Sequence, residues 1–150
     1  MRIAVGSDHA GFDVKALVLT HLASRGHEVL DLGAHDATTS VDYPDVGVAI
    51  GEAVVNASCD LGVAICGTGI GISIAANKVP GVRAALVHDA TTARLAREHN
   101  HANVLCLGAR VLGPAVILDA LDAWLQTAPS EGRHLGRIEK LAGLDGSATR

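Results

Sequence analysis

A cysteine followed by three alternating glycines stands near the middle of the chain, in the run Cys66-Gly67-Thr68-Gly69-Ile70-Gly71. The apolar residues 61–65 before it predict a buried strand, and residues 72–78 after it predict a short helix. A strand, a glycine turn and a helix in this order direct unpaired N–H groups and a helix dipole at an anion. Since a thiol beside a helix N-terminus ionises more readily than a free one, Cys66 is a candidate nucleophile or base.

Other polar residues adjoin the ends of predicted elements. Asp8 and His9 follow the first predicted strand. Asp8 is either a functional residue or the cap of the next helix, and His9 adds a titratable donor. Arg110 follows the last predicted strand. His99 and Asn100 follow a predicted helix, and His99 suits an acid–base role and a helix-end cap equally well.

Two arginines near the end of the chain form a further candidate site. Arg133 and Arg137 are four residues apart, so they share one face of the final predicted helix, residues 133–142. That face is either solvated or, with His134 nearby, a binding site for a phosphate monoester, which paired guanidinium groups hold well. The spacing alone leaves both interpretations open.

The glycine run matches neither of the common nucleotide motifs. The dinucleotide fingerprint needs glycine at the sixth place, which is Ile72 here, although Asp89 stands about twenty residues on, where a ribose-binding acid would. No Gly-Lys-Ser/Thr follows, so the run is not a P-loop. His99 and His101 lack a nearby cysteine, and we expect no metal site and no cofactor.

Composition limits the class of protein. The chain has 150 residues, of which 49% are hydrophobic and 19% charged, as in one globular domain. A net charge of −4 argues against binding to nucleic acid or to a membrane surface, and no apolar run reaches the roughly 18 residues of a membrane span. The odd number of cysteines favours a reduced, cytoplasmic setting, with Cys59 and Cys106 as packing residues.

Strands and helices alternate along the chain. The apolar patterns predict strands at 3–6, 28–32, 61–66, 83–87 and 103–107, and helices at 12–24, 45–56, 72–78, 90–98, 114–126 and 133–142. This order predicts an α/β fold, a three-layer αβα Rossmann-like domain with a five-stranded parallel sheet. Residues 1–150 then form a single domain, with 143–150 as a frayed tail, and ligands bind at the carboxyl ends of the strands.

Six blocks of sequence, taken together, resemble a known family. They are Val5-Gly6-Ser7-Asp8-His9-Ala10-Gly11-Phe12, Asp42-Tyr43-Pro44, the run from Cys66 to Lys78, His99-Asn100, Asn103-Val104-Leu105 with Gly108-Ala109-Arg110, and Gly132-Arg133-His134 with Arg137. In this order they closely resemble the ribose/galactose isomerase family of sugar-phosphate isomerases, in particular its ribose-5-phosphate isomerase B branch. The resemblance covers residues from about 2 to about 142 without large gaps.

The resemblance implies an activity and the residues that perform it. Members of this branch interconvert ribose 5-phosphate and ribulose 5-phosphate, a reaction of the pentose phosphate pathway, without a metal. By resemblance, Cys66 is the base that moves a proton between C2 and C1, and His99 is the acid that opens the furanose ring. Another branch has serine in place of the cysteine and a glutamate four residues later, whereas this chain has Cys66 and Ile70.

The resemblance also implies how the substrate is held. Residues at the family's substrate positions are Asp8, His9, Gly67, Gly69, Ile70, Gly71, Asn100, Arg110, Arg133 and Arg137. Stabilising the enediolate intermediate requires a base and donors near the oxyanion, so we expect the glycine-turn N–H groups to serve the oxyanion and Thr68 to help place Cys66. We expect the phosphate to bind His9, Arg133 and Arg137, assisted by Arg110. Family members are dimers or tetramers with shared sites, so the expected partners are a small phosphorylated sugar and further copies of this chain.

Three other functions remain open at this point. A six-carbon sugar phosphate, of the galactose or allose 6-phosphate type, would use the same residues and differ only in pocket depth. A non-catalytic nucleotide-binding module would use the glycine run with Asp89. A catalytically idle subunit is the third, which the presence of Cys66, His99 and the arginines disfavours.

Overall fold

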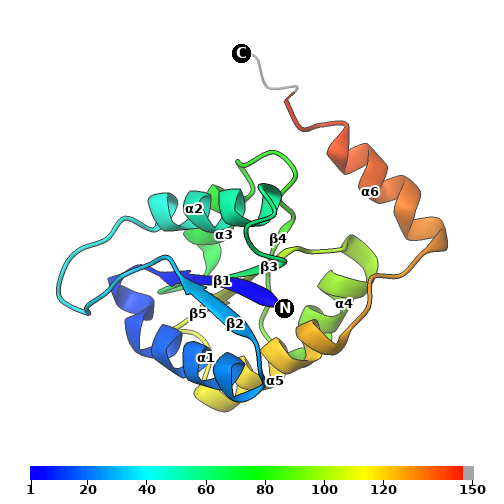
Figure 1. Ribbon diagram of the computed structural model, residues 1–150. Helices are drawn as coiled ribbons and strands as arrows, with labels where there is room; N and C mark the ends of the chain where they lie inside the picture. Colours follow the sequence, from blue (N-terminus) through cyan, green and yellow to red (C-terminus); the bar gives the residue numbers. More distant parts are fainter. Residues whose placement is uncertain (147–150) are drawn as a thin grey trace.

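The structure is a computed structural model, and it describes residues 1–146. Five strands alternate with helices (Figure 1), as the sequence predicted. The strands are β1 (Arg2–Ser7), β2 (Glu28–Asp31), β3 (Leu61–Cys66), β4 (Ala84–Leu86) and β5 (Val104–Gly108). The α-helices are α1 (Phe12–Ser24), α2 (Tyr43–Val55), α3 (Ile70–Ala76), α4 (Ala90–Asn100), α5 (Pro114–Gln126) and α6 (Leu135–Ala142), and the 3₁₀ turns are η1 (His9–Gly11) and η2 (Gly132–His134).

All five strands are parallel and lie in the order β2-β1-β3-β5-β4. Every residue of β3 and β5 is buried, as expected of central strands covered on both sides. The predicted α/β fold with a five-stranded parallel sheet is therefore confirmed. No helix within residues 1–146 combines the length and apolar character that crossing a bilayer requires.

Helices cover both faces of the sheet (Figure 1). Large side chains such as Ile65, Leu105 and Leu107 point to the face covered by α1, α4 and α5, where Trp124 is fully buried. The opposite face, under α2 and α3, carries small residues, and a Cβ on Gly62 would lie 2.5 Å from Ile50 Cγ2. The small residues let α2 lie close to the sheet, and Cys66 belongs to this face.

The chain reverses its direction of winding between β1 and β3. From β1 it proceeds outward to β2 at one edge, whereas β3 leads toward β5 and β4 at the other. In open α/β sheets, ligands bind where the order reverses, beside the carboxyl ends of the strands. Asp8 and Cys66 stand at those two ends, and the Asp8 N–H donates to Ile65 O at 3.2 Å.

Several predicted boundaries were wrong by a few residues. The helix at 90–98 extends to Asn100, so His99 and Asn100 lie inside its last turn instead of after it. The final helix begins at Leu135, and Arg133 lies in the preceding 3₁₀ turn. Residues 143–146 of the predicted tail form a hydrogen-bonded turn in which the Asp145 carboxylate accepts the Gly81 N–H at 2.9 Å, and 147–150 lie outside the described residues.

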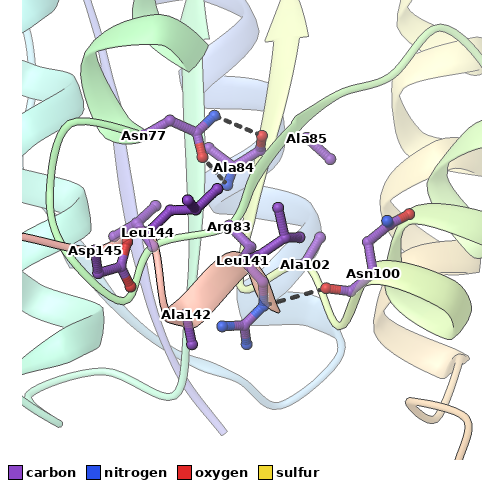
Figure 2. Close-up of a pocket in the computed structure, with 11 residues that line it drawn as sticks. Asn77, Arg83, Ala84, Ala85, Asn100, Ala102, Leu141, Ala142, Leu144 and Asp145 are labelled. Atoms are coloured by element: carbon purple, nitrogen blue, oxygen red, sulfur yellow. Dashed lines mark hydrogen bonds between the residues drawn. The ribbon is translucent and has the colours of Figure 1, made fainter. Parts of the chain in front are cut away.

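The outer side of the edge strand β4 is hydrogen-bonded to a side chain. The Asn77 amide donates to Ala84 O at 2.8 Å and accepts the Ala84 N–H at 2.9 Å (Figure 2). These are the two backbone groups of Ala84 that face away from β5, because the neighbouring Arg83 carbonyl accepts from the β5 side. The amide therefore occupies the place that a further strand would take.

A buried ion pair fixes α1 against β2. Lys15 is only 2% exposed, and its Nζ lies 2.6 and 2.7 Å from the two carboxylate oxygens of Asp31 and 2.7 Å from Gly33 O. A buried ammonium group is stable only when its donors are used, and here three bonds use them. The pair also holds Gly33 near Ser7, at the start of the loop that crosses the carboxyl edge.

We predict that Lys15→Met lowers the free energy of unfolding by about 2 kcal/mol, because it leaves the Asp31 carboxylate and the Gly33 carbonyl without their donor. Glu28→Gln is the control, since the exposed Arg2–Glu28 pair should contribute at most about 0.5 kcal/mol. Urea denaturation of both variants measures the difference. Equal losses in the two variants would contradict the assignment.

Candidate active site

Cys66 ends β3 with its side chain turned back toward the glycine turn, residues 67–71. The Gly69 N–H donates to Cys66 Sγ at 3.1 Å, and only 4% of the residue is exposed. Gly69 has a φ of +77°, which a residue with a side chain adopts at a cost. A Cβ there would also lie 2.5 Å from Leu86 Cδ1, so both backbone angle and space require glycine.

The N–H groups around the sulfur are open to a ligand. Those of Gly67, Thr68 and Gly71 donate to no atom of residues 1–146. The Ile70 N–H is used locally, because it donates to Thr68 Oγ1 at 3.3 Å. Helix α3 begins at this point, so its dipole adds to the positive potential. The sulfur is thus held by a backbone N–H, and the Thr68 hydroxyl accepts a hydrogen bond from the turn.

Asp8 and His9 follow β1 and lie next to the end of β3, where the glycine turn begins. The buried Asp8 carboxylate accepts the Gly11 N–H at 3.0 Å, so the residue caps η1, as one of its two interpretations predicted. The neighbouring His9 is exposed, and its Nδ1 accepts the Val41 N–H at 3.4 Å from the loop that precedes α2. Nε2 of His9 has no hydrogen bond to residues 1–146 and is available to a substrate.

Arg110 and Tyr43 enclose the glycine turn from two sides. The Arg110 N–H donates to Gly67 O at 2.9 Å, and its side chain would touch a Cβ on Gly67 at 3.4 Å. The Tyr43 ring lies over Gly71, where a Cβ would be 2.7 Å from two ring carbons. Tyr43 was not among the predicted site residues, although the Asp42-Tyr43-Pro44 block of the resemblance was the signal for it.

The other two cysteines are packing residues, as predicted. Cys59 and Cys106 are buried, and all three cysteines are free thiols. Burial raises the pKa of the Cys106 thiol strongly, with a smaller contribution from the nearby Cys66. Burial also raises the pKa of Cys59, which keeps both thiols protonated at neutral pH. Neither thiol is therefore a candidate for a base.

The remaining predicted site residues lie at the opposite end of the sheet. Cys66 pairs with Gly108 at the end of β5, whereas His99 and Asn100 precede the start of β5 at Val104. Four residue steps of a strand separate those ends by about 13 Å. Arg83, just before β4, donates from Nε to Asn100 O at 3.1 Å and so fixes this end of α4 (Figure 2).

Arg133 and Arg137 join His99 there through the turn that follows α5. The Ser130 N–H and hydroxyl both donate to Glu98 O, at 2.9 and 2.7 Å, which ties this turn to α4. The His134 ring then stacks on the His99 ring with centroids 4.3 Å apart. We name this group of side chains the amino-end cluster: His99, Asn100, Arg133, His134 and Arg137. Within one chain, the predicted site is therefore divided between two ends of the sheet.

A cavity of about 350 Å³ lies between α6 and the edge strand β4 (Figure 2). Of the predicted site residues only Asn100 lines it, together with Asn77, Arg83, Leu141 and Asp145. The cavity is thus separate from Cys66. Within residues 1–146 no group of three acidic, histidine or cysteine side chains is placed to hold a metal ion.

Asp89, the residue that a nucleotide-binding module would use, has a structural role. Its carboxylate accepts the Thr92 N–H at 2.6 Å, and the Thr92 hydroxyl accepts the Asp89 N–H at 3.2 Å. This reciprocal pair is a capping box at the start of α4. The hydrogen bonds from Thr92 lower the pKa of Asp89, consistent with an ionised cap.

The fold is that of an α/β protein with a thiol and a glycine turn at the point where the sheet order reverses. The sequence model of the Ribose/Galactose Isomerase family matches residues 3–141. The chain belongs to that family.

Individual relatives agree along nearly the whole length. Ribose-5-phosphate isomerase B of Escherichia coli (strain K12) is 42% identical over 144 residues, covering 96% of both chains. The solved structure of ribose-5-phosphate isomerase B from Clostridium thermocellum has a TM-score of 0.94 at 50% identity, covering 96% of this chain and 97% of that one. Galactose-6-phosphate isomerase subunit LacB of Clostridium acetobutylicum is 45% identical over 126 residues, covering 84% of this chain and 72% of that protein.

We predict that Cys59→Ala and Cys106→Ala leave turnover unchanged, whereas Cys66→Ala abolishes it, because burial raises the pKa of the first two thiols and prevents their ionisation. Steady-state isomerase kinetics with circular dichroism of each variant checks this. Iodoacetamide followed by peptide mass spectrometry should label Cys66 first. Loss of turnover in a folded Cys106→Ala variant would contradict the prediction.

Proposed function

We propose that this chain interconverts ribose 5-phosphate and ribulose 5-phosphate by proton transfer through an enediolate, with no metal. The observation that carries the proposal is the Gly69 N–H held on Cys66 Sγ at 3.1 Å, within a turn whose other N–H groups are free. Relatives named ribose-5-phosphate isomerase B, at 42% and 50% identity, support the choice of substrate. The three free cysteines suit a reducing, cytoplasmic compartment.

Cys66 is the proposed base. The proton on C2, next to the sugar carbonyl, is weakly acidic, so the base must lie close and the developing oxyanion must meet donors. A sulfur that already accepts one N–H is a better acceptor as a thiolate than as a thiol. Cys66 then takes the proton from C2 and returns it to C1, and a proton passes from O2 to O1 in the enediolate. The N–H groups of Gly67, Thr68 and Gly71 stabilise the oxyanion.

A second copy of the chain is proposed to complete the site. His99, Asn100, Arg133 and Arg137 have the side chains that ring opening and phosphate binding need, but lie at the wrong end of their own sheet. Two copies arranged about a twofold axis would place each amino-end cluster against the other copy's Cys66. The exposed Leu135 and Leu141 of α6 provide apolar surface for such contact. His9 and Arg110, from the first copy, would then assist in holding the phosphate.

A six-carbon sugar phosphate is the second candidate substrate. The LacB relative at 45% identity favours it, and the same residues would act on it. Kinetics with ribose 5-phosphate, allose 6-phosphate and galactose 6-phosphate separates the two. The nucleotide-binding module is disfavoured, because its acid, Asp89, is committed to capping α4.

We predict that Cys66→Ala abolishes exchange of the C2 proton of ribose 5-phosphate with deuterated water, while substrate binding stays nearly intact. Proton NMR measures the exchange and calorimetry measures the binding. Cys59→Ala is the matched control and should exchange at the wild-type rate. Persistent exchange in Cys66→Ala would show that another group is the base.

We also predict that an inactive variant, Cys66→Ala, and an impaired one, His99→Asn, restore each other. When Cys66→Ala and His99→Asn are mixed and reassembled, a mixed dimer contains one site with both residues intact, so about a quarter of the wild-type activity should return. Activity before and after subunit exchange, with the mass from light scattering, measures this. No recovery in a mixture shown to contain mixed dimers would mean that each chain builds its own site.

A further inference from the structure

His134 lies flat against His99, with ring centroids 4.3 Å apart and ring planes inclined by 6°. The two rings come from different elements, since His99 is in the last turn of α4 and His134 is in η2. The proposed mechanism gives His99 the ring-opening step and gives His134 none. A parallel contact this close between two titratable rings restricts both their orientation and their charge.

We propose that His134 is a positioning residue that holds the His99 imidazole in the orientation and protonation state of the ring-opening acid. The inference rests on the proposed function and adds to it a residue that acts through another one.

The orientation follows from how η2 is tied to α4. Two bonds from Ser130 to Glu98 O, and a 2.6 Å contact between His101 Nε2 and Ser130 O, fix the chain just before η2. The backbone therefore places His134 next to the end of α4. His99 is about one third exposed, and without the stacked ring its side chain would be free to change rotamer.

The charges around the two rings differ. His134 Nε2 faces Arg133 Nε at 3.5 Å, which supplies an N–H to a lone pair that only the neutral ring has. His99 Nε2 instead faces the Glu98 carboxylate at 3.7 Å. Desolvation, then His99, Arg133 and Arg137, lower the pKa of His134 against a smaller opposing effect of Glu98.

His134 is therefore the ring of the pair that stays neutral more readily. Two protonated rings at this separation would repel each other, beside two arginines that are already cationic. A neutral His134 removes that repulsion and offers the face of an aromatic ring to the His99 cation. Because its pKa is lowered, His134 remains neutral to a lower pH than an ordinary histidine does.

The variants His134→Ala and His134→Phe test the role, with Lys140→Ala, on the exposed face of α6, as the matched control. Proton NMR follows the titration of His99 in each variant without substrate. We expect the His99 midpoint to fall in His134→Ala and to stay near the wild-type value in His134→Phe, which keeps a flat ring. Equal midpoints in wild type and His134→Ala would overturn the proposal.

Kinetics adds a second readout. The alkaline limb of the pH profile of kcat/KM for ribose 5-phosphate should move to lower pH in His134→Ala and recover in His134→Phe. In a His99→Asn background the His134 substitutions should change kcat by less than about twofold, because their effect passes through His99. Undiminished effects in that background, expressed mainly in KM, would make His134 a direct phosphate ligand and overturn the proposal.

The two proposals fail separately. If the wild-type chain does not interconvert the pentose phosphates, the proposed function fails, while the NMR titration still decides whether His134 controls the charge of His99. If the wild type is active and His99→Asn is impaired, but the His134→Ala titration and pH profile match those of Lys140→Ala, only the positioning role fails.

Discussion

The close approach between the glycine turn and the end of β5 is the constraint on which the proposed chemistry depends. A Cβ on Gly108 would lie 2.6 Å from Thr68 O, and a Cβ on Gly69 would lie 2.9 Å from the Leu107 carbonyl carbon. Because both positions are glycine, the backbone of the turn can lie in direct contact with the backbone of β5. Because the turn lies against β5, the Gly69 N–H reaches the Cys66 sulfur, and the N–H groups of Gly67, Thr68 and Gly71 have no partner within residues 1–146.

The sheet determines which residues can meet in one chain. In a parallel sheet every strand-to-helix turn lies at the carboxyl ends of the strands, so Asp8, Cys66 and Arg110 gather there without any special contact. Each helix then runs back toward the amino ends of the strands. The residues at the carboxyl ends of the helices therefore gather at that end of the sheet. His99 and Asn100, in the last turn of α4, are therefore at the far end for a topological reason. A shared site is the arrangement in which both groups contribute to one substrate.

The sequence was sufficient for the fold because the signals were local. Apolar runs such as 61–65 and 103–107 alternate with amphipathic helices, and the glycine turn is visible in the residue types alone. The stacked pair His99–His134 was not predicted, because a contact between α4 and η2 depends on bonds from Ser130 to Glu98 that no periodicity encodes. The 3₁₀ turn before the last helix was not predicted for a similar reason. A 3₁₀ turn and the first turn of an α-helix differ in whether a backbone N–H bonds the carbonyl three or four residues back, which residue types do not show.

The side-chain amide of Asn77 has a consequence for how copies of this chain can associate. By bonding both outward backbone groups of Ala84, it removes the template on which a foreign strand would align. Sheet-to-sheet addition, which tends to continue without limit, is thereby blocked at this edge, and association through helices remains. Protection against fibril growth through this edge follows from one amide placed beside a three-residue strand.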